Sequence, residues 1–230
     1  MLILVPTPLS QTTPKLPVLS ADLPLLRDCS TWVVENAKPA RAALGMLNLA
    51  RPTRDLTILE LDKLERPERI KLIQRAAAGE PVGLMSDAGC PAVADPGASL
   101  VRLAHEHACP VRPLVGPSSI MLALMGSGLE GQRFQFHGYP PLDATERQRW
   151  ISATESASKS QACTQLCIET PFRNDKWIEA LLTHLKPTTR VCVGWDLTGD
   201  AEHLTTKTVA DWRKNPPKPG KQPCIFAWLA

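Results

Sequence analysis

The first half of this 230-residue chain alternates short apolar segments with longer amphipathic ones, and this pattern constrains the fold most. Short runs of apolar or β-branched residues bounded by Pro, Gly, Asp or Ser are typical of buried strands. They occur at 2–5, 31–34, 57–61, 82–85 and 111–115. Helix-length segments follow at 38–49, 68–78, 99–107 and 118–125. Strands that alternate with helices predict a mainly parallel sheet with helices on its faces.

The second half mixes strands and helices less regularly after the glycine-rich segment 126–131. Strands are predicted at 134–139, 165–169, 190–195 and 224–228, and helices at 145–157, 175–185 and 209–213. This pattern favours a mixed sheet. We therefore expect an α/β protein of two domains, an N-terminal domain over 1–116 and a C-terminal mixed α/β domain over 117–230.

Cysteine usage and hydropathy indicate a reducing compartment. The seven cysteines form no CxxC pair and no Cys/His cluster with zinc spacing, so neither a disulfide framework nor a metal site is predicted. The apolar start at 1–5 is too short for a signal peptide, and no run approaches the roughly 20 apolar residues of a membrane span. We expect a cytoplasmic protein without a membrane segment.

The glycine pattern Gly126-x-Gly128-x-x-Gly131 formally matches the dinucleotide-binding motif. That motif acts directly after a strand and at the start of a helix. Here it follows a predicted helix and precedes a predicted strand, so a helix end and turn is the favoured interpretation. The chain also lacks the GxxxxGK[ST] phosphate loop and the GxSxG nucleophile elbow.

Two loops rich in Pro, Gly and Ser, at 86–97 and 115–119, each follow a predicted strand and lead into a helix. In parallel sheets ligands bind outside the carboxyl ends of the strands, so two such loops predict a pocket there. The structural alternative is a pair of tight connections in which Asp95 or Ser99 caps the next helix. Proline is in excess, with 22 residues, and its fixed φ makes such loops rigid.

These loops resemble motifs of a known family. The segment 86–97 is similar to SDAGTPxxxDPG, 115–119 to PGPxA/S and 136–140 to F-x-G-F-x-P. Weaker likenesses are 4–9 to VATPIGN, 34–38 to AEDTR and 168–173 to YESxHR. All occur in the family's order. The chain thus resembles the tetrapyrrole methylase superfamily of S-adenosylmethionine (SAM) dependent methyltransferases, and most closely its ribosomal RNA small-subunit methyltransferase I group.

The resemblance implies a tetrapyrrole methylase-like fold, a homodimer, and SAM in the cleft between two α/β domains. Asp87 and Cys90 would face the methionyl end, and Ile168, Gly194 and Pro223 the adenine. The full set of implied cofactor residues is Leu9, Asp87, Cys90, Ser118, Ser119, Ile120, Ile168, Gly194 and Pro223.

The implied activity is ribose 2′-O-methylation of small-subunit ribosomal RNA, of the 16S type. A hydroxyl acceptor needs a base, and the candidates by loop position are Asp87, Glu35 and Glu169. Each has a structural alternative: Asp87 as a ligand for the cofactor's ammonium group or a turn cap, Glu35 and Glu169 as ion-pair partners of Lys38 and Arg173. A tetrapyrrole (precorrin or uroporphyrinogen) C-methyltransferase and a SAM-binding protein without catalysis stay open as alternatives.

Two segments depart from the family pattern. Glu35-Asn-Ala-Lys38 lacks an acid and a hydroxyl of AEDTR, and Phe172 replaces the His of YESxHR. The formal net charge of 26 − 23 = +3 gives weak support for an RNA partner. Basic residues near Trp150, Trp177 and Trp212 form either an RNA-binding patch or scattered charge over core tryptophans.

Overall fold

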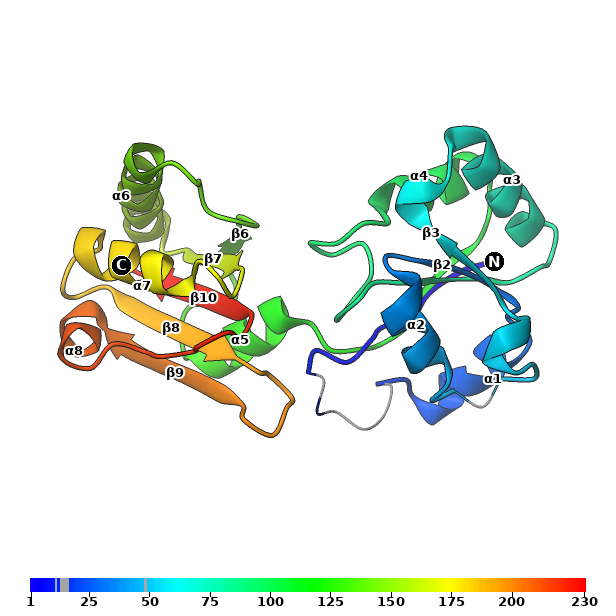
Figure 1. The fold of residues 1–230 in the computed structure, drawn as a ribbon. Helices are drawn as coiled ribbons and strands as arrows, with labels where there is room; N and C mark the ends of the chain where they lie inside the picture. Colours follow the sequence, from blue (N-terminus) through cyan, green and yellow to red (C-terminus); the bar gives the residue numbers. More distant parts are fainter. Residues whose placement is uncertain (11, 13–16, 48) are drawn as a thin grey trace. The chain divides into compact units, whose positions relative to one another are not determined.

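The computed structural model describes residues 1–10, 12, 17–47 and 49–230. The chain divides into two compact units, Met1–Ser118 (unit 1) and Ser119–Ala230 (unit 2), shown in Figure 1. The first unit ends at residue 118, against 116 in the sequence-based expectation. Each unit has its own sheet and its own core.

Unit 1 contains a five-stranded sheet with the order β3-β2-β4-β1-β5. Every pairing in it is parallel, as predicted. The strands are β1 (Leu2–Leu4), β2 (Thr31–Val34), β3 (Thr57–Glu60), β4 (Val82–Met85) and β5 (Val111–Pro113). Because all strands run the same way, the loops after them emerge at one edge of the sheet.

Helices cover both faces of this sheet. They are α1 (Leu23–Arg27), α2 (Ala37–Leu44), α3 (Arg66–Ala77) and α4 (Ala98–Glu106), with 3-10 turns η1 (Ser20–Asp22), η2 (Thr53–Asp55) and η3 (Leu61–Lys63). Leu2 packs in the core with α3 and α4, whereas its neighbour Ile3 packs on the other face with α1 and α2. Successive side chains of β1 therefore alternate between the two cores, one on each face of the sheet. Helix α2 ends at Leu44; its predicted extension to 49 includes residue 48, which lies outside the described residues.

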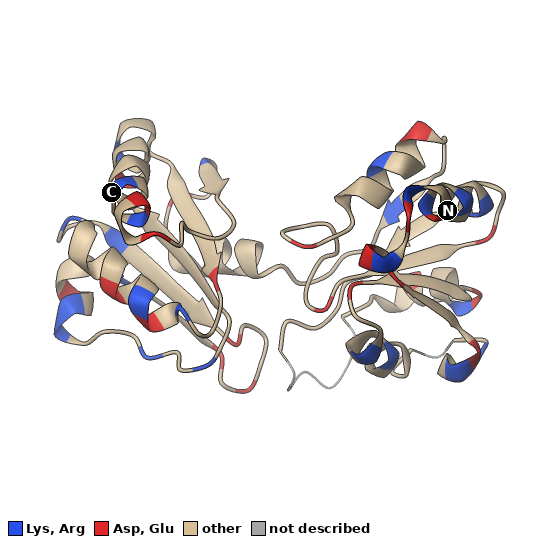
Figure 2. Ribbon diagram, turned by 45° about the horizontal axis from the view of Figure 1, so that its top comes forward, with Lys and Arg blue, Asp and Glu red and all other residues tan. Residues whose placement is uncertain are grey.

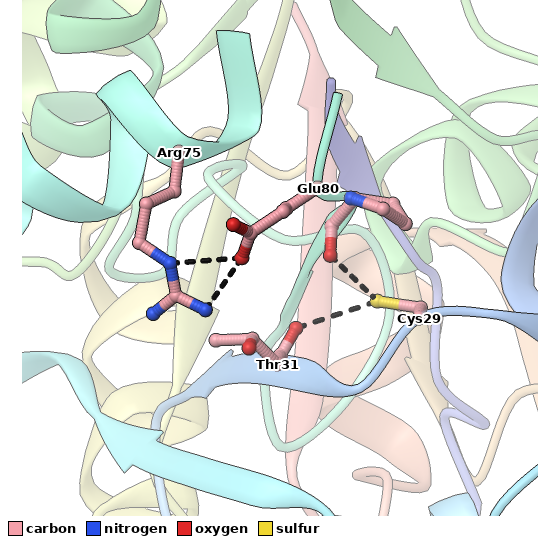
Figure 3. A network of polar contacts seen from close by, with 5 residues as sticks. Cys29, Thr31, Arg75 and Glu80 are labelled. Atoms are coloured by element: carbon pink, nitrogen blue, oxygen red, sulfur yellow. Dashed lines mark hydrogen bonds and ion pairs between the residues drawn. The ribbon is translucent and has the colours of Figure 1, made fainter. Parts of the chain in front are cut away.

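The amino ends of β2 and β4 are joined by a structural network (Figure 3). The buried Cys29 thiol donates to the carbonyls of Thr31 and Pro81, at 3.3 and 3.4 Å. Burial raises the pKa of Cys29 to about 11, so the thiol stays protonated and acts as a donor. Nearby, Arg75 pairs with Glu80 at 2.6 Å. These contacts join the segments that lead into β2 and β4 at the amino edge of the sheet.

Unit 2 contains a mixed five-stranded sheet with the order β6-β7-β10-β8-β9, in which only β6 and β7 are parallel. The strands are β6 (Phe134–Phe136), β7 (Thr164–Glu169), β8 (Arg190–Trp195), β9 (His203–Thr208) and β10 (Cys224–Leu229). Strand β9 was not predicted from the sequence. This edge strand is largely polar, and all six of its residues are half-buried, so it lacks the apolar run that marked the others.

The helices of unit 2 lie on both faces of its sheet. They are α5 (Ser119–Ser127), α6 (Ala144–Gln161), α7 (Asn174–His184) and α8 (Val209–Lys214). Phe226 and Trp228 of β10 pack with Trp177 and Trp212 of the helices. Trp177 and Trp212 are therefore core residues, as the structural alternative predicted. No helix among the described residues is long and apolar enough to cross a membrane.

Helix α5 covers the opposite face of the unit 2 sheet. Its Gly126 lies against Leu204 of β9, where a Cβ atom would come within 2.2 Å of the leucine side chain. Gly128 follows α5 with φ +66°, a conformation that glycine adopts at little cost. The glycine-rich segment is thus a close helix–sheet contact followed by a turn, which agrees with the favoured sequence interpretation.

Candidate functional site

Three loops of unit 1 meet at the carboxyl edge of its sheet. They follow β1, β4 and β5, which are neighbours because β1 lies between the other two. The loop after β1 contains residues 5–10, the loop after β4 residues 86–97, and the loop after β5 residues 114–118. The two loops singled out in the sequence are therefore joined through a third.

The loops after β1 and β4 are connected by a backbone pair. The Thr7 N–H donates to the Gly89 carbonyl at 2.9 Å, and the Gly89 N–H donates back to Thr7 at 3.1 Å. The buried Thr7 hydroxyl donates to the carbonyl of Ser86 at 3.2 Å. Gly89 has φ +75°, and Leu9 lies so close that a Cβ on Gly89 would be 3.1 Å from its Cδ2. The two loops form one rigid surface.

Cys90 connects the loop after β4 to the loop after β5. Its thiol donates to the Pro117 carbonyl at 3.3 Å and lies 3.7 Å from that of Gly116. Gly116 in turn contacts Pro6, since a Cβ there would come within 2.1 Å of the proline ring. The structure thus brings together the predicted residues Leu9 and Cys90, and it shows Cys90 as a link between loops.

Carboxylates gather beside these loops, at the ends of the neighbouring strands β2 and β4. The Asp87 N–H donates to Glu35 Oε2 at 3.1 Å, and Asn36 Nδ2 donates to Asp87 Oδ2 at 2.6 Å. The sequence contains no Lys or Arg from residue 76 to residue 101. The loop after β4 therefore adds two carboxylates, Asp87 and Asp95, and no cation to this edge.

Asp95 belongs to the same cluster. The cap position of α4 is Gly97, and no side chain caps the helix, so the structural alternative in which Asp95 or Ser99 caps it is wrong. Burial raises the pKa of Asp95 to about 6; repulsion from Glu35 and Asp87 adds to this, and a hydrogen bond from Ser86 opposes it. Because burial is the main cause of this shift, no local sequence pattern signalled it.

The cluster does not resemble a metal centre. Within the described part of the chain, no three His, Cys, Asp or Glu side chains are grouped as metal ligands. Asp87 is exposed and Glu35 and Asp95 are half-buried, so the carboxylates border the loop surface. Such an arrangement suits an organic cation, which needs acceptors and diffuse negative charge.

The predicted residues of unit 2 lie at one end of its sheet. Ile168 of β7 is opposite Ile225 of β10, which is opposite Gly194 of β8. A Cβ on Gly194 would be 2.8 Å from Leu204 and 3.1 Å from Ile225. Pro223 directly precedes β10 and is exposed. Ile168 and Gly194 therefore lie in one row across the sheet, and Pro223 lies two residues before Ile225 of that row.

Glu169 is held in an ion pair. Its Oε1 lies 2.6 Å from Arg173 Nη2 and accepts hydrogen bonds from Arg173 Nε at 2.8 Å and the Thr170 N–H at 2.6 Å. The side chain of Glu169 is only 4% exposed. The structural alternative for this residue is confirmed, because its carboxylate is already used to fix the loop after β7.

The remaining predicted residues lie where the chain passes from unit 1 to unit 2. Ser118 ends unit 1, and Ser119 begins α5. Ile120 is 8% exposed, so its side chain is mostly covered. Two surface hollows in unit 2 contain none of the predicted site residues.

Sequence comparison finds relatives named as ribosomal RNA methyltransferases. The chain is 34% identical over 139 residues to "Ribosomal RNA small subunit methyltransferase I" of Mesorhizobium japonicum, covering 60% of this chain and 46% of that protein. It is 28% identical over 210 residues to the protein of that name from Vibrio cholerae, covering 91% of this chain and 69% of that one. The chain thus spans about half the length of the first relatives it matches. No family model matches it.

Comparison with solved structures decides the fold. Uroporphyrin-III-C-methyltransferase from Thermus thermophilus aligns with a TM-score of 0.55 at 16% identity, covering 99% of this chain and 91% of that one. A diphthine synthase aligns with a TM-score of 0.60 at 15% identity, covering 100% and 89%. The chain has the tetrapyrrole methylase fold. The predicted fold class is therefore confirmed, and so is the resemblance of the sequence to ribosomal RNA small subunit methyltransferase I.

Within the tetrapyrrole methylase fold, the parallel sheet of unit 1 supplies the loop edge, and the mixed sheet of unit 2 supplies the row through Ile168 and Gly194. The loops after β4 and β5 were predicted from their Pro and Gly content. The loop after β1 has a weaker signal in the sequence, because only the hydrogen bonds between Thr7 and Gly89 show that Thr7 closes the surface.

Proposed function

We propose that this protein is a SAM-dependent methyltransferase that acts on the ribose of small-subunit ribosomal RNA. The observation that carries the proposal is the three-loop edge of unit 1, where Thr7, Gly89 and Cys90 hold the resemblance motifs together. Relatives at 34% and 28% identity are named ribosomal RNA small subunit methyltransferase I. The proposal includes a homodimer and, because ribosomes are the proposed substrate, a cytoplasmic location.

The donor set of the edge fits SAM. Its methionyl end carries an ammonium group and a sulfonium, both of which favour nearby carboxylates such as Asp87 and Asp95. The molecule has no phosphate, which agrees with the absence of a phosphate-binding loop. Rigid Pro and Gly loops offer fixed backbone donors and acceptors. The cofactor supplies an electrophilic methyl group for transfer.

We assign Leu9, Asp87 and Cys90 of unit 1 to the methionyl end. Ser118 ends the loop after β5, and Ser119 and Ile120 begin α5. The two serine hydroxyls are assigned as polar contacts to the cofactor, whereas the Ile120 side chain is mostly covered. Ile168, Gly194 and Pro223 of unit 2 are assigned to the adenine. Substitution of Gly194 by Val tests this last assignment, since any side chain there displaces Leu204 or Ile225.

A ribose hydroxyl needs a base that accepts its proton, and two of the three candidate carboxylates remain for this role. Glu169 is bound to Arg173, which leaves Glu35 and Asp87 at the loop edge. Their mutual contact runs through the Asp87 N–H, so the Glu35 carboxylate positions the Asp87 backbone. We assign Asp87 the role of cofactor ligand and Glu35 that of base or positioning group.

Two measurements test the function. Calorimetry is expected to show binding of S-adenosylhomocysteine that Asp87→Ala weakens and that Asp28→Ala, at an exposed position of unit 1, leaves unchanged. Incubation with methyl-labelled SAM and small ribosomal subunits from cells lacking the gene is expected to label the RNA. Uroporphyrinogen is the second acceptor in this assay. If it is labelled and RNA is not, the substrate is a tetrapyrrole. Binding without label in either acceptor would favour a SAM-binding protein without catalysis.

A further inference from the structure

The loop after β7 presents an unusually exposed aromatic side chain. Phe172 is 86% exposed, more than any other large hydrophobic side chain among the described residues. Such exposure forgoes the stabilisation that burying a phenylalanine provides. Phe172 is also the position where the chain departs from the YESxHR pattern. It therefore has no role in the core and is available for an external contact.

Phe172 is held on a fixed turn. Directly after it, Arg173 binds the buried Glu169 carboxylate and also donates from Nε to the Thr170 hydroxyl at 3.2 Å. Glu169 accepts the N–H of Thr170, which closes the turn on its other side. Because both flanks are tied to one buried carboxylate, the ring is presented with little freedom to fold back.

Lysines surround this turn from two segments. Lys176 is exposed in the first turn of α7, four residues after Phe172. The loop 215–223 is drawn to the same helix start by Asn174, whose Nδ2 donates to the Gln222 carbonyl at 2.7 Å and lies 3.5 Å from that of Gly220. Asn174 is completely buried. This contact places Lys221, which lies between Gly220 and Gln222, beside the start of α7.

The surface has a positive balance. The loop 215–223 contains Lys218 and Lys221 and no acidic residue, and Figure 2 shows its basic positions along the segment after α8. Arg173 is neutralised by Glu169. Asp175 and Glu179 are exposed acidic residues of α7, against the exposed Lys176, Lys218 and Lys221. We call Phe172, Lys176, Lys218 and Lys221 the Phe172 platform.

An exposed ring with flanking lysines matches one ligand chemistry. Unpaired nucleobases stack on aromatic side chains, and lysines contact the phosphates on either side. We propose that the Phe172 platform binds a single-stranded segment of the RNA substrate, with one unpaired base stacked on Phe172 and adjacent phosphates near Lys176 and Lys221. This inference rests on the proposed function and adds to it the form of RNA that is recognised.

Binding of a fluorescein-labelled oligouridylate, followed by anisotropy at low salt, tests the platform directly. We expect Phe172→Ala to lower the affinity at least fivefold, since stacking contributes about 1–3 kcal/mol per base. Phe172→Trp should retain it, and Phe172→Leu should not, because leucine keeps the apolar surface but cannot stack. Met125→Ala, at a side chain 76% exposed on α5, is the matched control and should bind like the original protein.

The lysines have a separate readout. Lys221→Gln should reduce the slope of log affinity against log salt by about one, whereas Lys159→Gln, at an exposed position late in α6, should not. S-adenosylhomocysteine binding by calorimetry should be the same for all these variants, which shows that they are folded.

Each result decides between the two proposals. If the original protein labels RNA and Phe172→Ala binds the oligonucleotide equally well, the platform is wrong while the proposed function stands. Equal binding by Phe172→Leu would also overturn stacking. If Phe172→Ala instead shifts sedimentation from dimer to monomer with unchanged RNA affinity, the ring contacts protein and the inference fails. Failure of the proposed function appears separately, as absence of label with the original protein.

Discussion

Thr7 and Gly89 exchange two backbone hydrogen bonds, at 2.9 and 3.1 Å, although they lie on loops after different strands. This pair turns two loops into one surface before any ligand is present. A preorganised surface pays less ordering cost on binding than a flexible loop does. The stability of the pair and the affinity for ligand should therefore change together when it is disturbed.

Substitution of Gly89 tests this link. Gly89→Ala places a Cβ at φ +75° and 3.1 Å from Leu9, so we expect a loss of about 1–2 kcal/mol in the free energy of unfolding and weaker S-adenosylhomocysteine binding. Gly79→Ala is the matched control, with φ +110° and nothing within 4 Å. It should destabilise without changing affinity. Equal affinity for both variants would contradict the role of the pair.

The pH dependence of stability should report Asp95. Its pKa in the folded protein is about 6, against an ordinary 3.8. Because the unfolded chain loses this proton first, the carboxyl costs stability as pH rises from about 4 to about 6, and the cost persists above that range. We expect Asp95→Asn to add about 1 kcal/mol to the free energy of unfolding at about pH 8, and almost nothing below about pH 4.

Urea unfolding at several pH values measures this difference. An Asp95→Asn advantage that is constant across the range would show that Asp95 does not titrate as its burial predicts.

Thiol labelling should single out Cys90. It is the one cysteine of the seven that is not buried. Burial raises the pKa of its thiol, and the charge of Asp95 adds to this, so the thiolate is scarce and labelling of the native protein should be slow. The rate should rise about tenfold per pH unit below that pKa. Saturating S-adenosylhomocysteine should protect Cys90, as mass spectrometry of the labelled peptides would show.

Undiminished labelling of Cys90 in the presence of ligand would place the ligand elsewhere. Unfolding in urea provides the control, because all seven cysteines should then react at similar rates whether or not ligand is added.

Two ion pairs of similar length should contribute very differently to stability. Arg173→Leu leaves the buried Glu169 carboxylate without its partner, so we expect a loss of about 3 kcal/mol. Arg75→Leu breaks a pair of the same 2.6 Å separation whose side chains are 52% and 60% exposed, and should cost less than about 1 kcal/mol. Chemical denaturation of both variants measures the contrast.

The double variant Glu169→Gln/Arg173→Leu isolates the buried charge. It should recover part of the loss of Arg173→Leu, because no carboxylate then stays buried without a cation. If the two substitutions are additive, the ion pair contributes no coupling and the turn that presents Phe172 is held by other contacts.

Local patterns in the sequence were sufficient for most of the secondary structure. The apolar runs at 31–34, 82–85 and 190–195 are strands with those same bounds, because each run is buried on both faces of its sheet. The polar edge strand β9 was missed, since its half-buried residues show no such run. The Pro and Gly loops after β4 and β5 were found for a similar local reason, as these residues restrict or permit particular backbone angles.

The sequence by itself therefore determined the fold class, the loop-bearing strand ends and the family resemblance. Tertiary structure decided which groups face each other. The Cys90 thiol meets the Pro117 carbonyl, and Asn174 holds the segment at Gln222, across 27 and 48 residues of chain. Such contacts depend on strand order and register, which no local pattern encodes, because they arise only when distant segments are packed against a shared core.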